Sequence, residues 1–202
     1  VIFLGDFIDR GEDLVQHRQV LKIVMDMVQQ ENALAVMGNH EFNALAYHTE
    51  HKGRFLRPHT TKNKKQHQAF LNEFPDDSEE KSVVLDFFYS LPLWLEIDGL
   101  RIVYACWDHD HIQTMDALCP SHRLGRAALV EASTKGTQAF DAIEVLLKGF
   151  ECELPAGISF HDKDGNPRTA VRVQWWKQHA LNLGEVVLPV GLDIADAGEI
   201  SI

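Results

Sequence analysis

The stretch that decides the fold is Val1–Gly11, with the sequence VIFLGDFIDRG. Its first four residues are apolar, which predicts a strand buried on both faces. Gly5 follows the strand, and because it has no side chain it lets the carboxylate of Asp6 project from the strand end. Asp9 and Arg10 come within the next turn. We therefore expect metal-binding and anion-binding groups together at one mouth of a sheet.

A second stretch, Leu34–Glu41 (LAVMGNHE), repeats this plan of apolar strand, glycine and polar side chains. The residues between the two stretches predict a helix. Acidic residues at its start suit the positive end of the helix dipole, and apolar residues recur at helical spacing; these are Glu12 and Asp13, then Leu14, Leu21, Val24 and Val28. A strand, helix and parallel strand joined by a right-handed crossover would bring Asp6 and Asn39 to the same sheet edge.

The pattern GDxxDRG followed by GNHE resembles the calcineurin-like metallophosphoesterases, and in particular the branch with Ser/Thr protein phosphatases and diadenosine tetraphosphatases. The match is strongest over Val1 to Asn43 and looser from Leu91 to Asp108. The resemblance implies a mixed α/β fold, a four-layer sandwich of two mixed β-sheets flanked by helices, here incomplete at both ends. We expect residues 1–202 to form a single domain of this type.

The resemblance also implies a chemistry: hydrolysis of phosphate esters by direct attack of a metal-bound hydroxide. Two divalent metal ions would lower the pKa of the attacking water and neutralise the phosphoryl oxygens. The mixed ligands suit Mn²⁺, Fe or Zn²⁺. Phosphoproteins and dinucleoside polyphosphates are the implied substrates, and the sequence does not decide between them.

Each site residue takes its expected role from this resemblance. Asp6 would bridge both metal ions, and Asn39 would bind the second one through its amide oxygen. His40 is the candidate general acid, because imidazole titrates near neutrality. Asp9 would orient His40 and favour its charged form, while the guanidinium of Arg10 would bind phosphate oxygens. Taken singly, each residue is also compatible with a cap, a turn or a surface ion pair.

A predicted hairpin places a tyrosine where the family has a metal-binding histidine. The runs Leu93–Ile97 and Leu100–Cys106 flank Asp98-Gly99, a sequence typical of tight turns. Aligned on the second strand, Tyr104 takes the place of that histidine. His109 or His111 could substitute for it, although a loop rich in Asp and His is usually just solvated.

Other ligands that the family uses are absent. No Asp-x-His strand precedes Val1, and no closing histidine motif follows. Asp6 and Asn39 alone are too few for a dinuclear centre. Three explanations compete. The chain is a fragment whose missing ends carry the ligands, or it is a degenerate relative that acts as a phosphate-binding or protein-interaction module, or the match is accidental, which two intact motifs in order argue against. We expect the 202 residues alone to bind metal poorly and to turn over slowly or not at all.

The composition of the chain indicates which partners and which cellular compartment to expect. The 202 residues carry a formal net charge of -11, which argues against general nucleic-acid binding. No membrane span or signal peptide is visible. The three cysteines are widely spaced, which indicates a reducing cytoplasm rather than a disulfide framework. A phosphorylated substrate is the expected partner, and the oligomeric state is left open.

Four segments beyond the motifs carry weaker predictions. The basic stretch His48–His67 is either a solvated surface segment leading into a helix near Gln66 to Phe74, or a lid that attracts an anionic substrate. The acidic run Asp76–Glu80 predicts a solvated loop. Residues Asp116 to Lys148 predict outer helices, and Gly157–Phe160 and Thr169–Val173 predict another hairpin.

Overall fold

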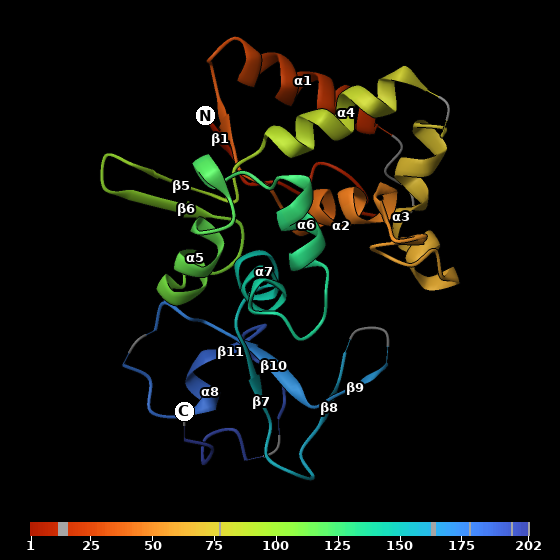
Figure 1. Ribbon diagram of the computed structural model, residues 1–202. Coiled ribbons are helices and arrows are strands. Elements are labelled where there is room, and N and C mark those ends of the chain that lie inside the picture. Colours follow the sequence, from red (N-terminus) through yellow and green to blue (C-terminus); the bar gives the residue numbers. More distant parts are fainter. Residues whose placement is uncertain (12–15, 77, 163–164, 178, 195, 202) are drawn as a thin grey trace. The chain divides into compact units, whose positions relative to one another are not determined.

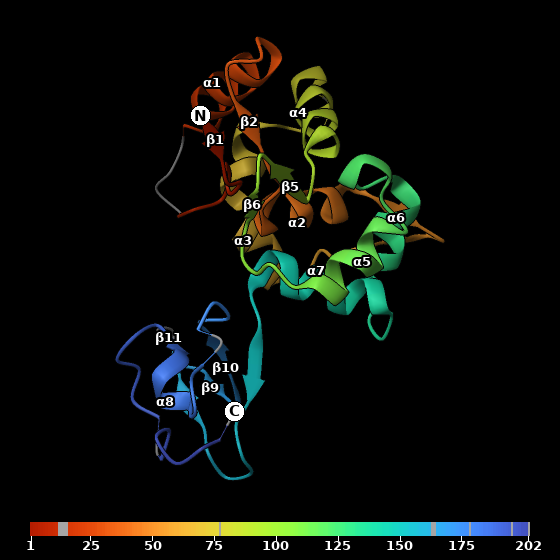
Figure 2. The same ribbon diagram turned by 90° about the vertical axis from the view of Figure 1, so that its left-hand side faces the viewer.

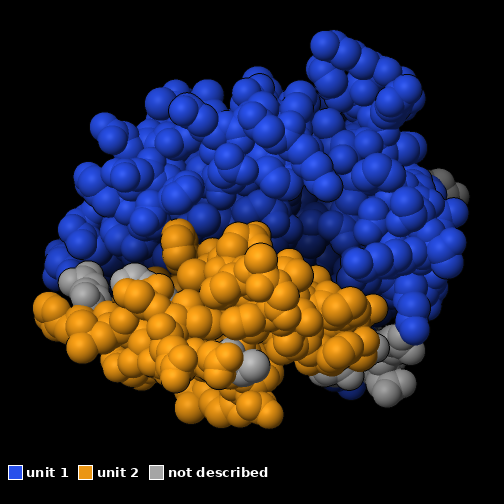
Figure 3. All heavy atoms as spheres, turned by 90° about the horizontal axis from the view of Figure 1, so that it is seen from below, with its two compact units in different colours: residues 1–148 blue, residues 149–202 orange. Residues whose placement is uncertain are grey.

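The computed structural model describes residues 1–11, 16–76, 78–162, 165–177, 179–194 and 196–201. The chain divides into two compact units, Val1–Lys148 and Gly149–Ile202, coloured separately in Figure 3. The predicted helix start at Glu12 and Asp13, and also Leu14, lie outside the described residues. The expectation of a single domain stays a prediction.

Unit 1 is mainly helical, with short strands at the two motifs (Figure 1). Its helices are α1 (His17–Gln29), α2 (Asn39–His48), α3 (Thr61–Glu73), α4 (Glu79–Ser90), α5 (His109–Asp116), α6 (Arg126–Ala132) and α7 (Gln138–Lys148), with a 3₁₀ turn at Pro120–His122. Its strands are β1 (Ile2–Phe3), β2 (Leu34–Ala35), β3 (Glu50–His51), β4 (Arg54–Phe55), β5 (Trp94–Ile97) and β6 (Leu100–Val103). The chain is thus a mixed α/β protein.

The parallel pair predicted for the two motif strands is confirmed. Ile2 lies opposite Leu34 and Phe3 opposite Ala35, and α1 connects the two strands with Leu21 and Val24 buried. The prediction that the first strand is buried on both faces is wrong, because Ile2 is 38% and Leu4 50% exposed. Among the described residues β1 pairs with β2 alone, which leaves much of its surface uncovered.

The hairpin around Asp98-Gly99 is also confirmed. β5 and β6 pair antiparallel, and both turn residues have positive φ, 49° for Asp98 and 81° for Gly99. This is the backbone that a tight two-residue turn requires. The hairpin leads directly into Tyr104.

Two predictions about the polar segments need correction. Helix α3 begins at Thr61, because the Thr60 hydroxyl accepts a hydrogen bond from the backbone of Asn63, and the basic stretch ends in a buried residue, His67. Helix α4 takes up part of the predicted acidic loop. Its cap is Ser78, and Glu79 follows in the first turn, where the helix dipole favours negative charge.

Residues Asp116 to Lys148 were predicted to form outer helices. For helix α7 this prediction is wrong, because α7 is a central part of the unit 1 core. Five of its side chains are buried: Ala139, Ala142, Ile143, Leu146 and Leu147. It packs against α5 and α6 (Figure 1). Its apolar residues therefore mark a buried face, and its polar residues face outward.

Unit 2 has a small sheet with β10 in the middle (Figure 2). Its elements are β7 (Glu151–Glu153), β8 (Phe160–His161), β9 (Pro167–Arg168), β10 (Ala170–Val173), α8 (Leu183–Val186) and β11 (Val187–Leu188). The predicted hairpin is correct only for β8 and β9. Residues Ala170–Val173 pair with β7 and β11 instead, because this places Val171 in the apolar core of the unit. No described helix is long and apolar enough to cross a membrane.

Candidate active site

The site is built where the loops after β1 and β2 meet. Gly5, Asp6 and Asp9 all have positive φ, at 72°, 58° and 54°, so the first loop turns sharply. A Cβ on Gly5 would lie 2.3 Å from the backbone nitrogen of Gly38. The two loops therefore touch backbone to backbone, which only glycine permits.

Glu41 connects the two loops through hydrogen bonds to both of them. Its carboxylate is fully buried and accepts hydrogen bonds from the backbone N–H groups of Asp6 and Phe7, both at 2.8 Å, and of Gly38 at 3.0 Å. Burial raises the pKa of Glu41 to about 7, although these hydrogen bonds act in the opposite direction. Glu41 is part of the GNHE motif, but no role was predicted for it. Its position three residues after Gly38 matches a helix capping box.

Asp6 is the centre of the cluster that the two loops form. Its Oδ2 accepts hydrogen bonds from Arg10 Nη1 at 2.7 Å and from the Tyr104 hydroxyl. Its Oδ1 lies 3.4 Å from the backbone nitrogen of His40, which donates to it, and the His40 ring nitrogen Nε2 lies 3.9 Å from Oδ2. The structure thus brings Asp6, Arg10 and His40 together.

His40 and Asn39 occupy the first turn of α2. The His40 side chain is 23% exposed, and burial lowers its pKa below the usual value. The charges of Asp6 and Asp9 raise this pKa, as expected for Asp9, but burial outweighs them. Burial of His40 therefore works against the charged imidazolium that a general acid needs.

The structure does not pair Asp9 with His40. Instead, the Asp9 carboxylate accepts from the backbone of Phe70 at 3.0 Å and lies 2.6 Å from Nδ1 of His67. The Asp9 backbone N–H donates to Nε2 of His17 at 2.9 Å. Two buried histidines on two different helices thus hold this residue in its left-handed conformation.

These two histidines are themselves held in hydrogen-bonded chains. Nδ1 of His17 lies 2.8 Å from a carboxylate oxygen of Glu73, and because Nε2 accepts from Asp9, Nδ1 carries the proton. Nε2 of His67 lies 3.1 Å from Nε2 of His48. Neither histidine could be assigned a role from the sequence, because residues far apart along the chain leave no local pattern.

Tyr104 lies at the site, as its alignment predicted. Its hydroxyl donates to Asp6, and burial together with this bond raises its pKa. His109 and His111, the candidate substitutes, lie in the first turn of α5, where Nδ1 of His111 is 2.5 Å from a carboxylate oxygen of Asp108. Asp108 is thus a helix cap.

The described residues do not fit a two-metal centre. Asp6 and Asn39 are oxygen donors of the type that divalent cations take. However, no group of three or more His, Cys, Asp or Glu side chains that could hold a metal ion comes together in the described part of the chain. One oxygen of Asp6 is also occupied by Arg10 and Tyr104.

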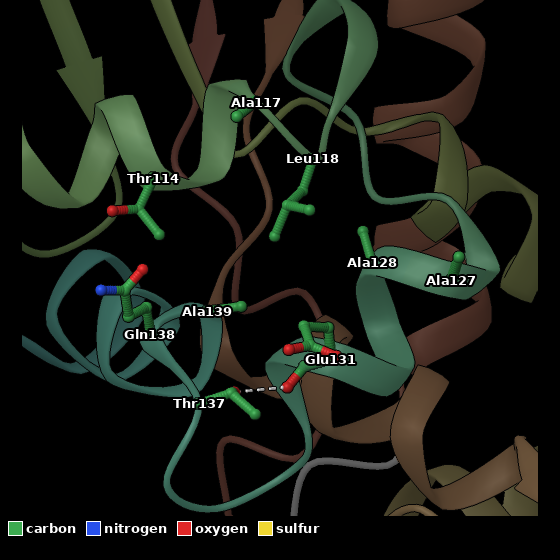
Figure 4. A pocket seen from close by; sticks show the side chains of 9 residues that line it. All are labelled: Thr114, Ala117, Leu118, Ala127, Ala128, Glu131, Thr137, Gln138 and Ala139. Atoms are coloured by element: carbon green, nitrogen blue, oxygen red, sulfur yellow. Dashed lines mark hydrogen bonds between the residues drawn. The ribbon is translucent and has the colours of Figure 1, made fainter.

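A cavity of about 680 Å³ lies elsewhere, between α5, α6 and α7 (Figure 4). Its lining is mostly alanine, threonine and leucine, and Glu131 is the charged residue in it. None of the predicted site residues contributes to this lining. The cavity therefore has no part in the chemistry of the motif loops.

A comparison with protein families matched residues 1–142 to the family described as calcineurin-like phosphoesterase. The chain belongs to this family of phosphoester-hydrolysing proteins. No curated protein matched the chain, and no solved structure did. The match includes both motif loops and every residue of the cluster around Asp6.

Proposed function

We propose that the two motif loops form a phosphoester site, at which the phosphoryl group of a substrate binds beside Asp6, Asn39, His40 and Arg10. The observation that carries this proposal is the contact of both loops at Asp6, whose carboxylate meets Arg10 from its own loop and the His40 backbone from the other. A guanidinium and an imidazole that lie 2.7 Å and 3.9 Å from the Asp6 carboxylate suit the binding of a phosphate ester.

Arg10 is the residue that would bind the phosphoryl oxygens. Its side chain is 57% exposed, and its planar fork matches two phosphate oxygens at once. His40 would hold or move the proton of the leaving oxygen. Asp9 would act indirectly, by fixing the turn that carries Arg10.

Metal dependence is the finer part of the proposal. Members of this family use two divalent ions, for which Mn²⁺, Fe or Zn²⁺ are the candidates, and Asp6 and Asn39 are the proposed ligands. The residues that the structure describes do not by themselves complete the centre. We also propose that the complete fold is a four-layer sandwich and that the protein is cytoplasmic.

Phosphate binding tests the site directly. Titration calorimetry with inorganic phosphate should show binding by the unmodified chain, weakened about tenfold or more in Arg10→Gln, because a charge-assisted hydrogen bond is lost. Arg18→Gln is the matched control, since Arg18 is exposed and pairs with Glu80. Equal phosphate affinity of Arg10→Gln and the unmodified chain would contradict the proposed site.

A second candidate function is a module that binds phosphorylated partners without hydrolysing them. The bond from Tyr104 to Asp6 favours it, because a neutral phenol stands where a metal ligand is expected. Hydrolysis of p-nitrophenyl phosphate with added Mn²⁺ discriminates the two. We expect slow turnover by the unmodified chain and tighter Mn²⁺ binding by Tyr104→His. Fast turnover by the unmodified chain would contradict the module.

A further inference from the structure

Arg57 is a second guanidinium close to the motif loops, within the basic stretch His48–His67 for which a solvated surface segment and an anion-attracting lid were the two expectations. It lies between α2 and α3. Its Nη1 donates to the side-chain oxygen of Asn43 at 2.6 Å, and its Nη2 donates to that of Gln66 at 2.8 Å. Its backbone N–H donates to Ala46 at 2.9 Å. The position of the guanidinium is therefore defined from both helices.

The charge of Arg57 is not cancelled by an ion pair within the described part of the chain. Both acceptors are neutral amides, and a guanidinium has more N–H donors than these two bonds use. The side chain is partly buried, and this burial lowers its pKa, while the more distant charges of Asp9 and Glu144 raise it. Arginine stays charged in proteins, so this is a fixed cation with donors to spare.

The two anchors of Arg57 place it next to the proposed site. Asn43 follows His40 by three residues and Asn39 by four, which puts all three on the same face of α2. Gln66 directly precedes His67, the residue that holds the Asp9 carboxylate. The charge of Arg57 also acts on His40. The guanidinium thus contacts α2 one helical turn beyond Asn39.

We propose that Arg57 binds a second anionic group of the substrate, joined to the phosphoryl group that Arg10 binds. This inference rests on the proposed function and specifies its substrate class: a phosphate ester with another phosphate or carboxylate close by. Two cations on one small site also offset the net charge of -11, which otherwise repels such substrates. An arginine serving only to join two helices would not discriminate between ligands.

Two simple anions test this proposal: inorganic phosphate, with one phosphoryl group, and pyrophosphate, with two. In metal-free buffer, titration calorimetry should show tighter binding of pyrophosphate by the unmodified chain. Arg57→Gln should weaken pyrophosphate binding about 10- to 100-fold and leave phosphate binding within about twofold, because only the second group loses a charged donor. Arg57→Lys keeps the charge but not the planar fork. Its affinity for pyrophosphate should therefore lie between those of the unmodified chain and of Arg57→Gln.

Two controls make the outcomes distinct. Arg54→Gln removes the same charge from an exposed position three residues earlier, and it should change neither affinity. Arg10→Gln should weaken both. An equal effect of Arg57→Gln on the two anions, or no effect on either, would overturn the role of Arg57. A lack of phosphate binding by the unmodified chain would instead contradict the proposed function itself.

Discussion

Glu41 is the residue on which the geometry of the two motif loops most depends. One of its oxygens accepts from Asp6 and Gly38, and the other accepts from Phe7. A buried carboxylate can serve all three donors because both of its oxygens are acceptors. No amide side chain offers the same pattern.

Glu41→Gln should therefore lower the free energy of unfolding by about 2 kcal/mol. The new NH₂ group would face a backbone N–H, which leaves a buried donor without an acceptor. Urea denaturation at pH 7.5 measures the change. Glu50→Gln, at an exposed position, should change the stability by less than about 0.5 kcal/mol. A Glu41→Gln protein as stable as this control would show that the three hydrogen bonds do not hold the loops.

The pKa of His48 predicts how the free energy of unfolding depends on pH. Burial, followed by the positive charges of His67 and Lys81, lowers its pKa to about 4. Because the folded pKa lies below the unfolded value of about 6.5, this contribution to stability is complete above pH 6.5 and is lost as the pH falls toward 4. The loss should amount to about 2 kcal/mol.

Urea denaturation between pH 7 and 4 checks this dependence. His48→Gln keeps a hydrogen-bonding group for Nε2 of His67 but removes the titration, so its stability should fall less over this range. If the unmodified chain and His48→Gln lose stability equally, another group is responsible.

At the scale of elements, the close approach of the loops after β1 and β2 is what creates the site. Gly5 has a φ of +72°, and its added Cβ would meet the backbone at Gly38. Gly53, in the β3–β4 turn, has a nearly equal φ of +76° but open space around it. Replacing each glycine by alanine therefore separates two losses of stability. Gly53 reports the penalty of the left-handed backbone alone, and Gly5 reports that penalty together with the steric clash between the loops.

Gly53→Ala should lower the free energy of unfolding by about 1 kcal/mol, the usual penalty of an alanine in the left-handed conformation. Gly5→Ala should cost at least about 2 kcal/mol more, because rigid backbone atoms must move apart. Thermal and urea unfolding of both variants give the comparison. Equal costs would mean that the two loops do not touch as described.

Elements set by local sequence were the ones that could be predicted. Asp98-Gly99 specified its turn, and the two motifs specified the parallel pair of β1 and β2. Burial of β1 was mispredicted because it depends on neighbours that an apolar run does not reveal. The same limit applies to the candidate site. The two motifs predicted that Asp6, Arg10 and His40 lie close together, but not that Asp9 meets His67 across 58 residues. Tertiary contacts of this kind have no local pattern.

At the scale of the whole molecule, every residue of the candidate site belongs to unit 1. Unit 2 has its own apolar cluster, which includes Val171, Leu183 and Val187. The family match ends at residue 142, within unit 1. The proposed phosphoester site, with Arg10 and Arg57, therefore lies in unit 1.

The most direct test of the central claim is the position of a bound phosphate analogue. Crystals of the chain grown with tungstate, whose anomalous scattering marks its position, would locate the anion. We predict a peak within hydrogen-bonding distance of the Arg10 guanidinium and beside His40. A tungstate ion bound only elsewhere, or none at saturating concentration, would contradict the claim that these two loops form a phosphoester site.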